Sequence, residues 1–218
     1  MIMGDASANR LGFVHTFTPA APAAGPASAW TILLLHGTGG DENDLIPLGR
    51  AIAPGAALLS PRGNVLEGSM PRFFRRLAEG VFDQEDLTRR TAELVAFVRA
   101  ATAHYGLDAQ RVIAAGFSNG ANIAASVLLR EAGVFRGALL LSPMLPFEPT
   151  KPPVLDATSV FIGAGQTDPI VPVAQVERLA ELLRGAGADV ALHWEPGGHG
   201  ITQREVGAAR RWVETSIL

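Results

Sequence analysis

The chain has 218 residues, of which 48% are hydrophobic and 18% charged, with a formal net charge of −3. This length and composition predict one compact domain, residues 1–218, with a sizeable core, and exclude a disordered or fibrous chain. The absence of a basic cluster argues against a nucleic-acid partner. Cysteine is absent, so disulfides and thiolate chemistry are excluded, and the reducing cytoplasm is the compartment that we expect.

The sequence also argues against export, a membrane span and a metal. Residues 1–10 contain Asp5 and no apolar run, which is unlike a secretory signal. Elsewhere no apolar run approaches the roughly 18 to 20 residues that span a bilayer. No group of His, Cys and carboxylate residues has metal-ligand spacing. We therefore expect neither a metal nor another cofactor, and we expect a small-molecule substrate.

The N-terminal part predicts an edge strand, a loop and a central strand. Alternation from Phe13 to Phe17 indicates a strand at the edge of a sheet. The prolines between Pro19 and Ala29 indicate a loop that connects paired strands, with a flexible N-terminal tail as the alternative. Trp30 to Leu35 is apolar on both faces, as is typical of a central parallel strand.

A glycine-rich loop, His36 to Leu45, follows that strand and could bind either a phosphate or an oxyanion. Neither Gly-x-Gly-x-x-Gly nor Gly-Lys-Ser/Thr occurs in it, which disfavours a dinucleotide or P-loop site. His-Gly-x-Gly after a strand instead offers a backbone N–H, here that of Thr38, as one half of an oxyanion hole. We expect His36 to hold this loop by hydrogen bonds.

The next stretch predicts a short helix from Asp41 to Ala53, a strand from Ala56 to Ser60 and an irregular segment up to Gly80. Long irregular connections usually have a function. Phe73 or Phe74 is a candidate for the wall of a substrate pocket, because buried aromatic rings supply much of a small pocket's contact area.

Three arginines lie in the same segment: Arg72, Arg75 and Arg76. They could meet an acidic substrate, or they could form ion pairs with the acidic residues Asp83, Glu85 and Asp86 that follow. The sequence leaves both interpretations open.

An amphipathic helix from Asp86 to Tyr105, closed by Gly106, precedes the most informative motif. The apolar strand from Val112 ends in Gly116-Phe117-Ser118-Asn119-Gly120 and continues as a helix from about Ala121. This is the nucleophile-elbow pattern, in which a sharp turn exposes a serine hydroxyl above the sheet. The turn is so crowded that residues two positions either side of the serine must be glycines.

The rest of the chain continues to alternate strands and helices. Strands are predicted at Gly137–Leu141, Val160–Ala164 and Val190–Trp194, and helices at Pro172–Arg184 and from Thr202, where a capping box begins. Such alternation predicts a mainly parallel sheet with helices on both faces. Ligands bind at the carboxyl ends of the strands in sheets of this kind.

Three residues lie at those strand ends, and together they are of the types that activate a serine as a nucleophile. Ser118 needs a base to remove its proton, and histidine suits neutral pH. Only His199, among five histidines, lies on a glycine-flanked loop after a late strand. Asp168 follows a strand end in the same way and would orient the imidazole. The order Ser, Asp, His is that of α/β-hydrolases.

These motifs together resemble the phospholipase/carboxylesterase family of small α/β-hydrolases, which includes acyl-protein thioesterases and bacterial carboxylesterases. The resemblance covers nearly the whole chain after Trp30 and rests on the following segments: His36 to Leu45, Ser60 to Gly63, Gly116 to Gly120, Gly165 to Pro169, and Gly198-His199. It implies an α/β-hydrolase fold without a lid domain, a shallow pocket and an oxyanion hole completed by the N–H of Asn119. Relatives of this kind often form homodimers.

The resemblance implies a serine hydrolase of the carboxylesterase type that cleaves short-chain esters through an acyl-enzyme. A thioesterase or a lysophospholipase with a longer acyl substrate is the alternative within the family. Thioesterase relatives commonly have Gln-Gly-Gly after the serine, where this chain has Asn119-Gly120-Ala121, so the acyl-chain preference stays open. A ligand-binding protein that has kept the fold without activity is the alternative from another class.

Overall fold

A computed structural model describes residues 11–21 and 25–218. Residues 1–10, which we expect not to be a secretory signal, lie outside the described residues. Part of the loop predicted between Pro19 and Ala29 also lies outside them.

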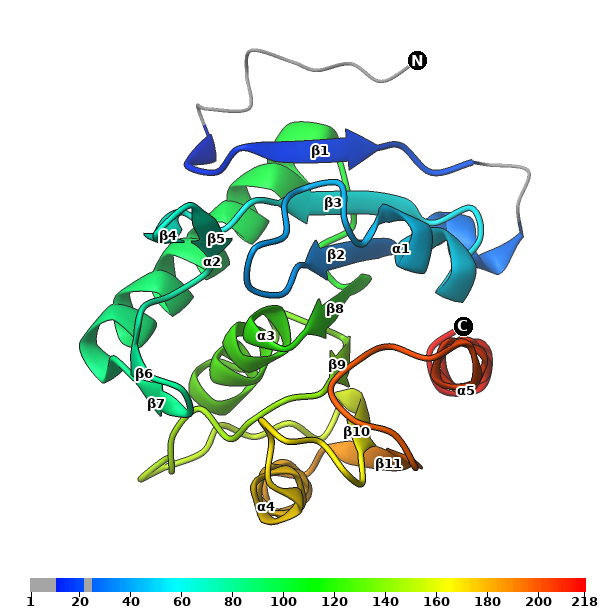
Figure 1. Cartoon of the computed structure of the whole chain (residues 1–218). Coiled ribbons are helices and arrows are strands. Elements are labelled where there is room, and N and C mark those ends of the chain that lie inside the picture. Colours follow the sequence, from blue (N-terminus) through cyan, green and yellow to red (C-terminus); the bar gives the residue numbers. More distant parts are fainter. Residues whose placement is uncertain (1–10, 22–24) are drawn as a thin grey trace.

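One seven-stranded sheet runs through the described residues in the order β1-β3-β2-β8-β9-β10-β11 (Figure 1). All neighbouring strands are parallel except β1 and β3, which are antiparallel. The predicted edge strand is confirmed, since β1 is at one end of the sheet. The strands of this sheet are β1 (His15–Thr18), β2 (Thr31–Leu35), β3 (Ala57–Pro61), β8 (Val112–Phe117), β9 (Gly137–Leu141), β10 (Ser159–Gly165) and β11 (Asp189–Glu195).

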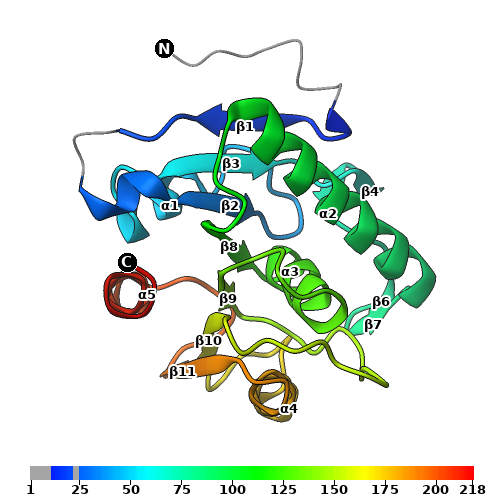
Figure 2. The same ribbon diagram turned by 180° about the vertical axis from the view of Figure 1, so that it is seen from behind.

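Five α-helices among the described residues cover both faces of the sheet, as the alternation predicted (Figures 1 and 2). Helices α2, α3 and α4 bury their apolar sides in one core layer, and α1 and α5 bury theirs in the other. The central strands β2 and β9 are buried along their whole length, and β8 is buried except for its last residue, Phe117. This burial explains why the three strands are apolar on both faces. The helices are α1 (Ile46–Ile52), α2 (Gln84–Tyr105), α3 (Asn119–Arg130), α4 (Val173–Gly185) and α5 (Gln203–Ser216); a short 3₁₀ helix, η3, spans Pro26–Ala29.

The helix predicted from Asp41 is shorter than expected. The Asp41 side chain accepts a hydrogen bond from the N–H of Asn43, which makes a local turn in place of a helical one. Helix α1 begins only at Ile46, with Pro47 in its first turn. The loop before β2 also differs from the prediction, because β1 and β2 are not paired with each other and β3 lies between them.

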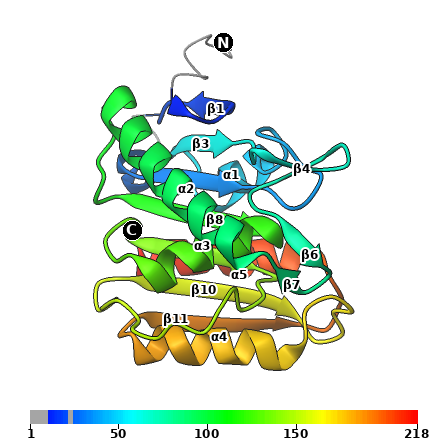
Figure 3. The same ribbon diagram turned by 90° about the vertical axis from the view of Figure 1, so that its left-hand side faces the viewer.

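The segment predicted to be irregular contains two small hairpins. Strands β4 (Val65–Glu67) and β5 (Met70–Arg72) form the first, and β6 (Arg76–Ala78) and β7 (Val81–Phe82) form the second. Figure 3 shows both at the end of the sheet to which the arrows of β3 and β10 point. The segment therefore lies at the carboxyl ends of the parallel strands, where the sequence placed the candidate site.

Two helices, α2 and α5, begin with a residue whose side chain caps the helix. Asp83 caps α2, its side chain accepting a hydrogen bond from the N–H of Asp86. Thr202 caps α5 and accepts from the N–H of Glu205, which confirms the predicted capping box. Within residues 11–21 and 25–218, no helix combines the length and apolarity that a membrane crossing requires.

Candidate active site

The turn between β8 and α3 is built as the nucleophile-elbow pattern requires. Ser118 has φ 51° and ψ −112°, a conformation that costs a non-glycine residue free energy. A Cβ atom at Gly116 would lie 2.5 Å from the backbone of Gly120, and one at Gly120 would overlap the carbonyl oxygen of Leu35. Only glycine fits at both positions, because Gly116 faces the backbone of the elbow itself and Gly120 faces the end of β2.

The structure brings the three predicted residues together although they are far apart in the chain. His199 Nε2 lies 2.9 Å from Ser118 Oγ, and His199 Nδ1 lies 2.7 Å from Asp168 Oδ2. The second carboxylate oxygen of Asp168 accepts hydrogen bonds from the backbone N–H groups of Ile170 and Val171, at 2.8 and 3.0 Å. The Asp168 side chain is 1% exposed, so these hydrogen bonds take the place of those that water would make.

The loop that carries His199 is packed tightly against the loop that carries Asp168. The N–H of Thr167 donates to the carbonyl of Gly197 at 3.1 Å. A Cβ at Gly165 would overlap the carbonyl oxygens of Gly197 and Gly198, so glycine permits this close approach. The Phe117 ring lies 5.2 Å from the His199 imidazole, centroid to centroid, and restricts its rotation from the side of the elbow.

Two backbone N–H groups beside Ser118 have no acceptor among the described residues, namely those of Thr38 and Asn119. The Asn119 group is in the first turn of α3, where helix N–H groups lack intrahelical partners. The Thr38 loop is anchored by its neighbour Gly39, which has φ 85° and donates to the carbonyl of Pro71 at 3.0 Å. Such a pair of amides is suited to stabilising negative charge on an oxygen.

His36 holds the glycine-rich loop, as predicted. Its Nδ1 lies 2.6 Å from the carbonyl oxygen of Gly37, and its Nε2 accepts from the N–H of Gly63 at 3.0 Å. The imidazole is therefore neutral, with its proton on Nδ1. Burial lowers the pKa of His36, outweighing the opposite effects of the Gly37 carbonyl and nearby carboxylates.

The structure corrects the assignment of Phe73 and Phe74 to the wall of the pocket. Both rings are at most 1% exposed and belong to the core beneath α2 and α3. The Phe73 N–H donates to Asn119 Oδ1 at 2.7 Å, so the backbone of the segment is tied to the elbow, while neither ring lines the cleft beside Ser118. A phenylalanine pair in a loop is compatible with either placement, and only the packing decides.

A small cleft of about 40 Å³ lies beside Ser118 and its apolar walls come from residues that the sequence analysis did not select. They are Phe82 of β7, Met144 after β9, and Ile170 and Val171 after Asp168. Position after a strand end was the one available signal, and it applies to three of them. Asn122 and Ser142 add polar groups to the same cleft.

The three arginines of the hairpin segment have different partners. Arg75 Nε donates to Asp83 Oδ2 at 2.7 Å, so for this residue the ion-pair interpretation holds. Arg72 and Arg76 instead share Glu67 of β4, which the sequence analysis did not consider. Both of these guanidinium groups line the cleft beside Ser118.

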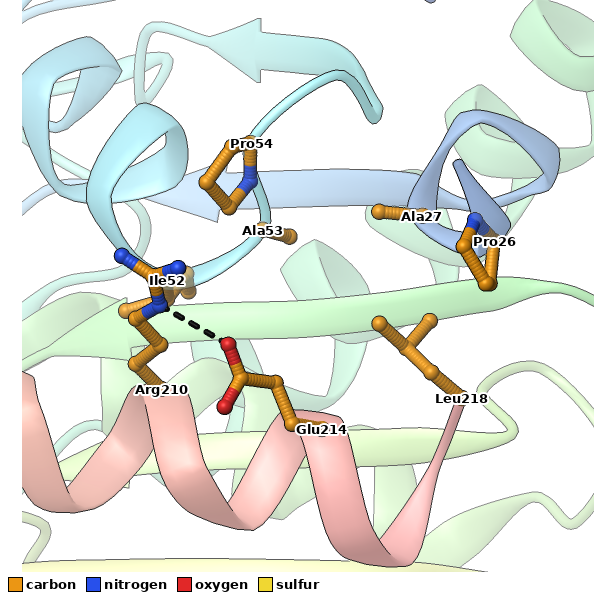
Figure 4. Close-up of a pocket in the computed structure, with 8 residues that line it drawn as sticks. All are labelled: Pro26, Ala27, Ile52, Ala53, Pro54, Arg210, Glu214 and Leu218. Atoms are coloured by element: carbon orange, nitrogen blue, oxygen red, sulfur yellow. Dashed lines mark hydrogen bonds and ion pairs between the residues drawn. The ribbon is translucent and has the colours of Figure 1, made fainter. Parts of the chain in front are cut away.

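A larger cavity of about 460 Å³ lies at the opposite end of the sheet, between η3, the end of α1 and α5 (Figure 4). Its two charged residues, Arg210 and Glu214, bind each other at 2.9 Å. The described residues that line it include no serine, threonine or histidine, and its one side-chain carboxylate is paired with Arg210, so we do not assign chemistry to it. Within the described part of the chain, no group of three or more His, Asp or Glu side chains could hold a metal ion.

Comparison with known proteins identifies the family of the chain. The family model described as phospholipase/carboxylesterase matches residues 21–217. The chain belongs to this family. It is 49% identical to the MhqD protein of Bacillus subtilis (strain 168) over 187 residues, covering 86% of this chain and 94% of that protein.

Solved structures of two bacterial carboxylesterases share the fold over almost the whole chain. A carboxylesterase from Bacillus cereus is 45% identical, with a TM-score of 0.92 over 97% of this chain and 98% of that one. A carboxylesterase from Mesorhizobium loti is 33% identical, with a TM-score of 0.85 over 93% and 95%. The predicted α/β-hydrolase fold is therefore confirmed. The chain is a hydrolase of the phospholipase/carboxylesterase family, and its structural neighbours include carboxylesterases.

Proposed function

We propose that the protein is a serine esterase that cleaves short-chain carboxylic esters through an acyl-enzyme. The observation that carries this proposal is the unbroken chain of contacts from Asp168 through His199 to Ser118, next to two unpaired amide groups. A protein of this fold that only bound ligands would gain nothing from a serine held at a strained φ of 51°.

In the proposed mechanism, His199 Nε2 removes the proton of Ser118 Oγ as the oxygen attacks the ester carbonyl. The N–H groups of Thr38 and Asn119 stabilise the oxyanion that forms. His199 then gives the proton to the leaving alcohol, and a water molecule activated by the same imidazole releases the acid. Asp168 keeps Nδ1 protonated and stabilises the imidazolium.

The size of the cleft supports a short acyl group. A cleft of about 40 Å³ encloses only a short part of a substrate, so a long acyl chain would extend out of it into solvent. This favours a carboxylesterase over the thioesterase or lysophospholipase alternative with a long acyl chain.

Labelling with a fluorophosphonate, followed by assays on short esters, tests the proposal. We expect the wild-type protein to be labelled and the Ser118→Ala variant not to be. That variant should lose roughly 10⁴- to 10⁶-fold in kcat, and Asp168→Asn about 10⁴-fold. Ser216→Ala, at the end of α5, is the matched control and should behave as wild type. Folded wild-type protein that is neither labelled nor active on any ester would support the ligand-binding alternative.

A further inference from the structure

The cleft beside Ser118 contains two guanidinium groups that the proposed reaction does not use. Arg72 ends β5 and Arg76 begins β6, and Glu67 of β4 lies between them. Arg76 donates to Glu67 through Nε and Nη2, at 3.0 and 2.7 Å. Arg72 Nη1 lies 3.2 Å from the same carboxylate. One acid thus holds both arginines beside the candidate nucleophile.

Each guanidinium keeps one nitrogen without an acceptor among residues 11–21 and 25–218. Arg72 donates through Nε to the carbonyl of Phe74 and through Nη1 to Thr38 Oγ1, at 3.2 and 2.7 Å, which leaves Nη2. Arg76 uses Nε and Nη2, which leaves Nη1. Neither remaining nitrogen is a fully buried unpaired atom, and both arginines line the cleft.

The local charge balance favours an anion. The two arginines share one ion-pair partner, Glu67, so one positive charge has no ion-pair partner of its own among the described residues. The Arg72 side chain is 3% exposed, and a buried charge without full compensation is unfavourable. Glu79 also lines the cleft. The hydrogen bonds to Glu67 have the largest effect in raising the pKa of Arg76, and the charge of Glu79 adds to it. Glu79 is exposed, however, and forms no ion pair with either arginine within the described residues. Glu79 therefore weakens the attraction for an anion without cancelling it.

Guanidinium groups bind carboxylates with charge-assisted, often bidentate hydrogen bonds. We propose that the preferred substrates are short esters that carry a second, free carboxylate, which Arg72 and Arg76 bind while Ser118 attacks the ester carbonyl. The monoester of a small dicarboxylic acid is the simplest member of this class. This inference rests on the proposed esterase function and specifies its substrate class.

Arg76 is the residue to substitute, because Arg72 also contacts Thr38 of the candidate oxyanion hole. The test compares monomethyl succinate with methyl butyrate, which has the same acyl length and no charge. A second pair, carboxymethyl butyrate and ethyl butyrate, places the carboxylate on the alcohol side. We expect wild-type kcat/KM to favour the anionic member of at least one pair, which also locates the carboxylate subsite.

In Arg76→Gln we expect kcat/KM for the favoured anionic ester to fall by about 10- to 100-fold, with less than about threefold change for its neutral partner. Arg75→Gln is the matched control: it removes a neighbouring arginine that pairs with Asp83 and does not line the cleft, and it should change neither value. Glu79→Gln should raise kcat/KM for the anionic ester severalfold. Wild-type preference for the neutral ester in both pairs would overturn the inference, as would equal losses on both esters in Arg76→Gln.

A binding experiment keeps this result separate from the catalytic one. Titration of folded Ser118→Ala protein with succinate by calorimetry should show binding that Arg76→Gln in the same background abolishes. If wild type hydrolyses no ester but succinate binds in this way, the esterase proposal fails and the carboxylate site stands. If esters are hydrolysed and succinate does not bind, the carboxylate site fails and the esterase proposal stands.

Discussion

At the scale of single residues, glycines decide whether the reactive groups meet. The sequence pattern explained Gly116 and Gly120 by crowding within the elbow itself. The structure adds that Gly120 also faces the backbone of Leu35 on the neighbouring strand. The elbow and the oxyanion loop are thus packed backbone to backbone. A side chain at this point would separate the two parts of the candidate site.

We therefore expect Gly120→Ala to lower the free energy of unfolding by at least about 3 kcal/mol, the upper end of overpacking costs. Gly185→Ala is the control, because a Cβ at this position in the last turn of α4 meets no atom within 4 Å. It should change stability by less than about 1 kcal/mol. Denaturant unfolding of both variants measures the difference, and equal stabilities would contradict the packing argument.

At the scale of elements, the two hairpins between β3 and α2 connect the core to the cleft. Phe74 is fully buried, and its ring makes an edge-to-face contact with Phe82, at a centroid distance of 5.1 Å. Phe82 is half-buried and lines the cleft. The first ring supports the second, so the same segment contributes to stability at one position and to the substrate side at another.

These roles predict different effects of two alanine substitutions. Phe74→Ala should lower the free energy of unfolding by about 3 to 5 kcal/mol and change the selectivity between a small and a bulky ester less than Phe82→Ala does. Phe82→Ala should destabilise less and lower kcat/KM for the bulky ester about tenfold relative to the acetate ester. Melting temperatures and kcat/KM on both esters measure this. Altered selectivity in Phe74→Ala alone would show that the cleft is lined differently.

At the scale of the whole molecule, the C-terminal helix closes the sheet just after the His199 loop. Glu205 in its first turn is 2% exposed and packs over Gly163 of β10. Burial raises the pKa of Glu205 to about 7, with nearby Glu195 adding to the shift. Burial by itself would also raise the pKa of Glu195, but hydrogen bonds from Arg204, His193 and Thr202 together lower it to about 2.

Between about pH 4.5 and pH 7, Glu205 keeps its proton in the folded protein and loses it in the unfolded protein. The free energy of unfolding should therefore fall as the pH rises through this range. Glu205→Gln removes this ionisation. We compare the free energy of unfolding of this variant with that of wild type at each pH. The difference, variant minus wild type, should be larger at pH 8 than at pH 4.5 by roughly 2 to 3 kcal/mol. Glu214→Gln, exposed on the same helix, is the control and should show no such difference. Denaturant unfolding at both pH values decides, and parallel behaviour of the two variants would contradict the prediction.

The sequence alone determined the alternation of strands and helices, the elbow, and the three residues that converge on it. These features are local: apolar periodicity, a glycine pattern and positions just after strand ends can be read along the chain. Parallel strands then bring those ends to one edge of the sheet, so Ser118, Asp168 and His199 meet without further information.

Only the tertiary structure decided which side chains of the hairpin segment face the core and which face the cleft. Phe73 and Phe74 are adjacent in a loop without periodicity, and their burial depends on contacts with α2 and α3. The partner of Arg72 and Arg76 is likewise Glu67, which pairing of β4 with β5 brings close, and not the acids that follow in the chain. Side-chain direction in irregular segments depends on long-range packing, which no local pattern encodes.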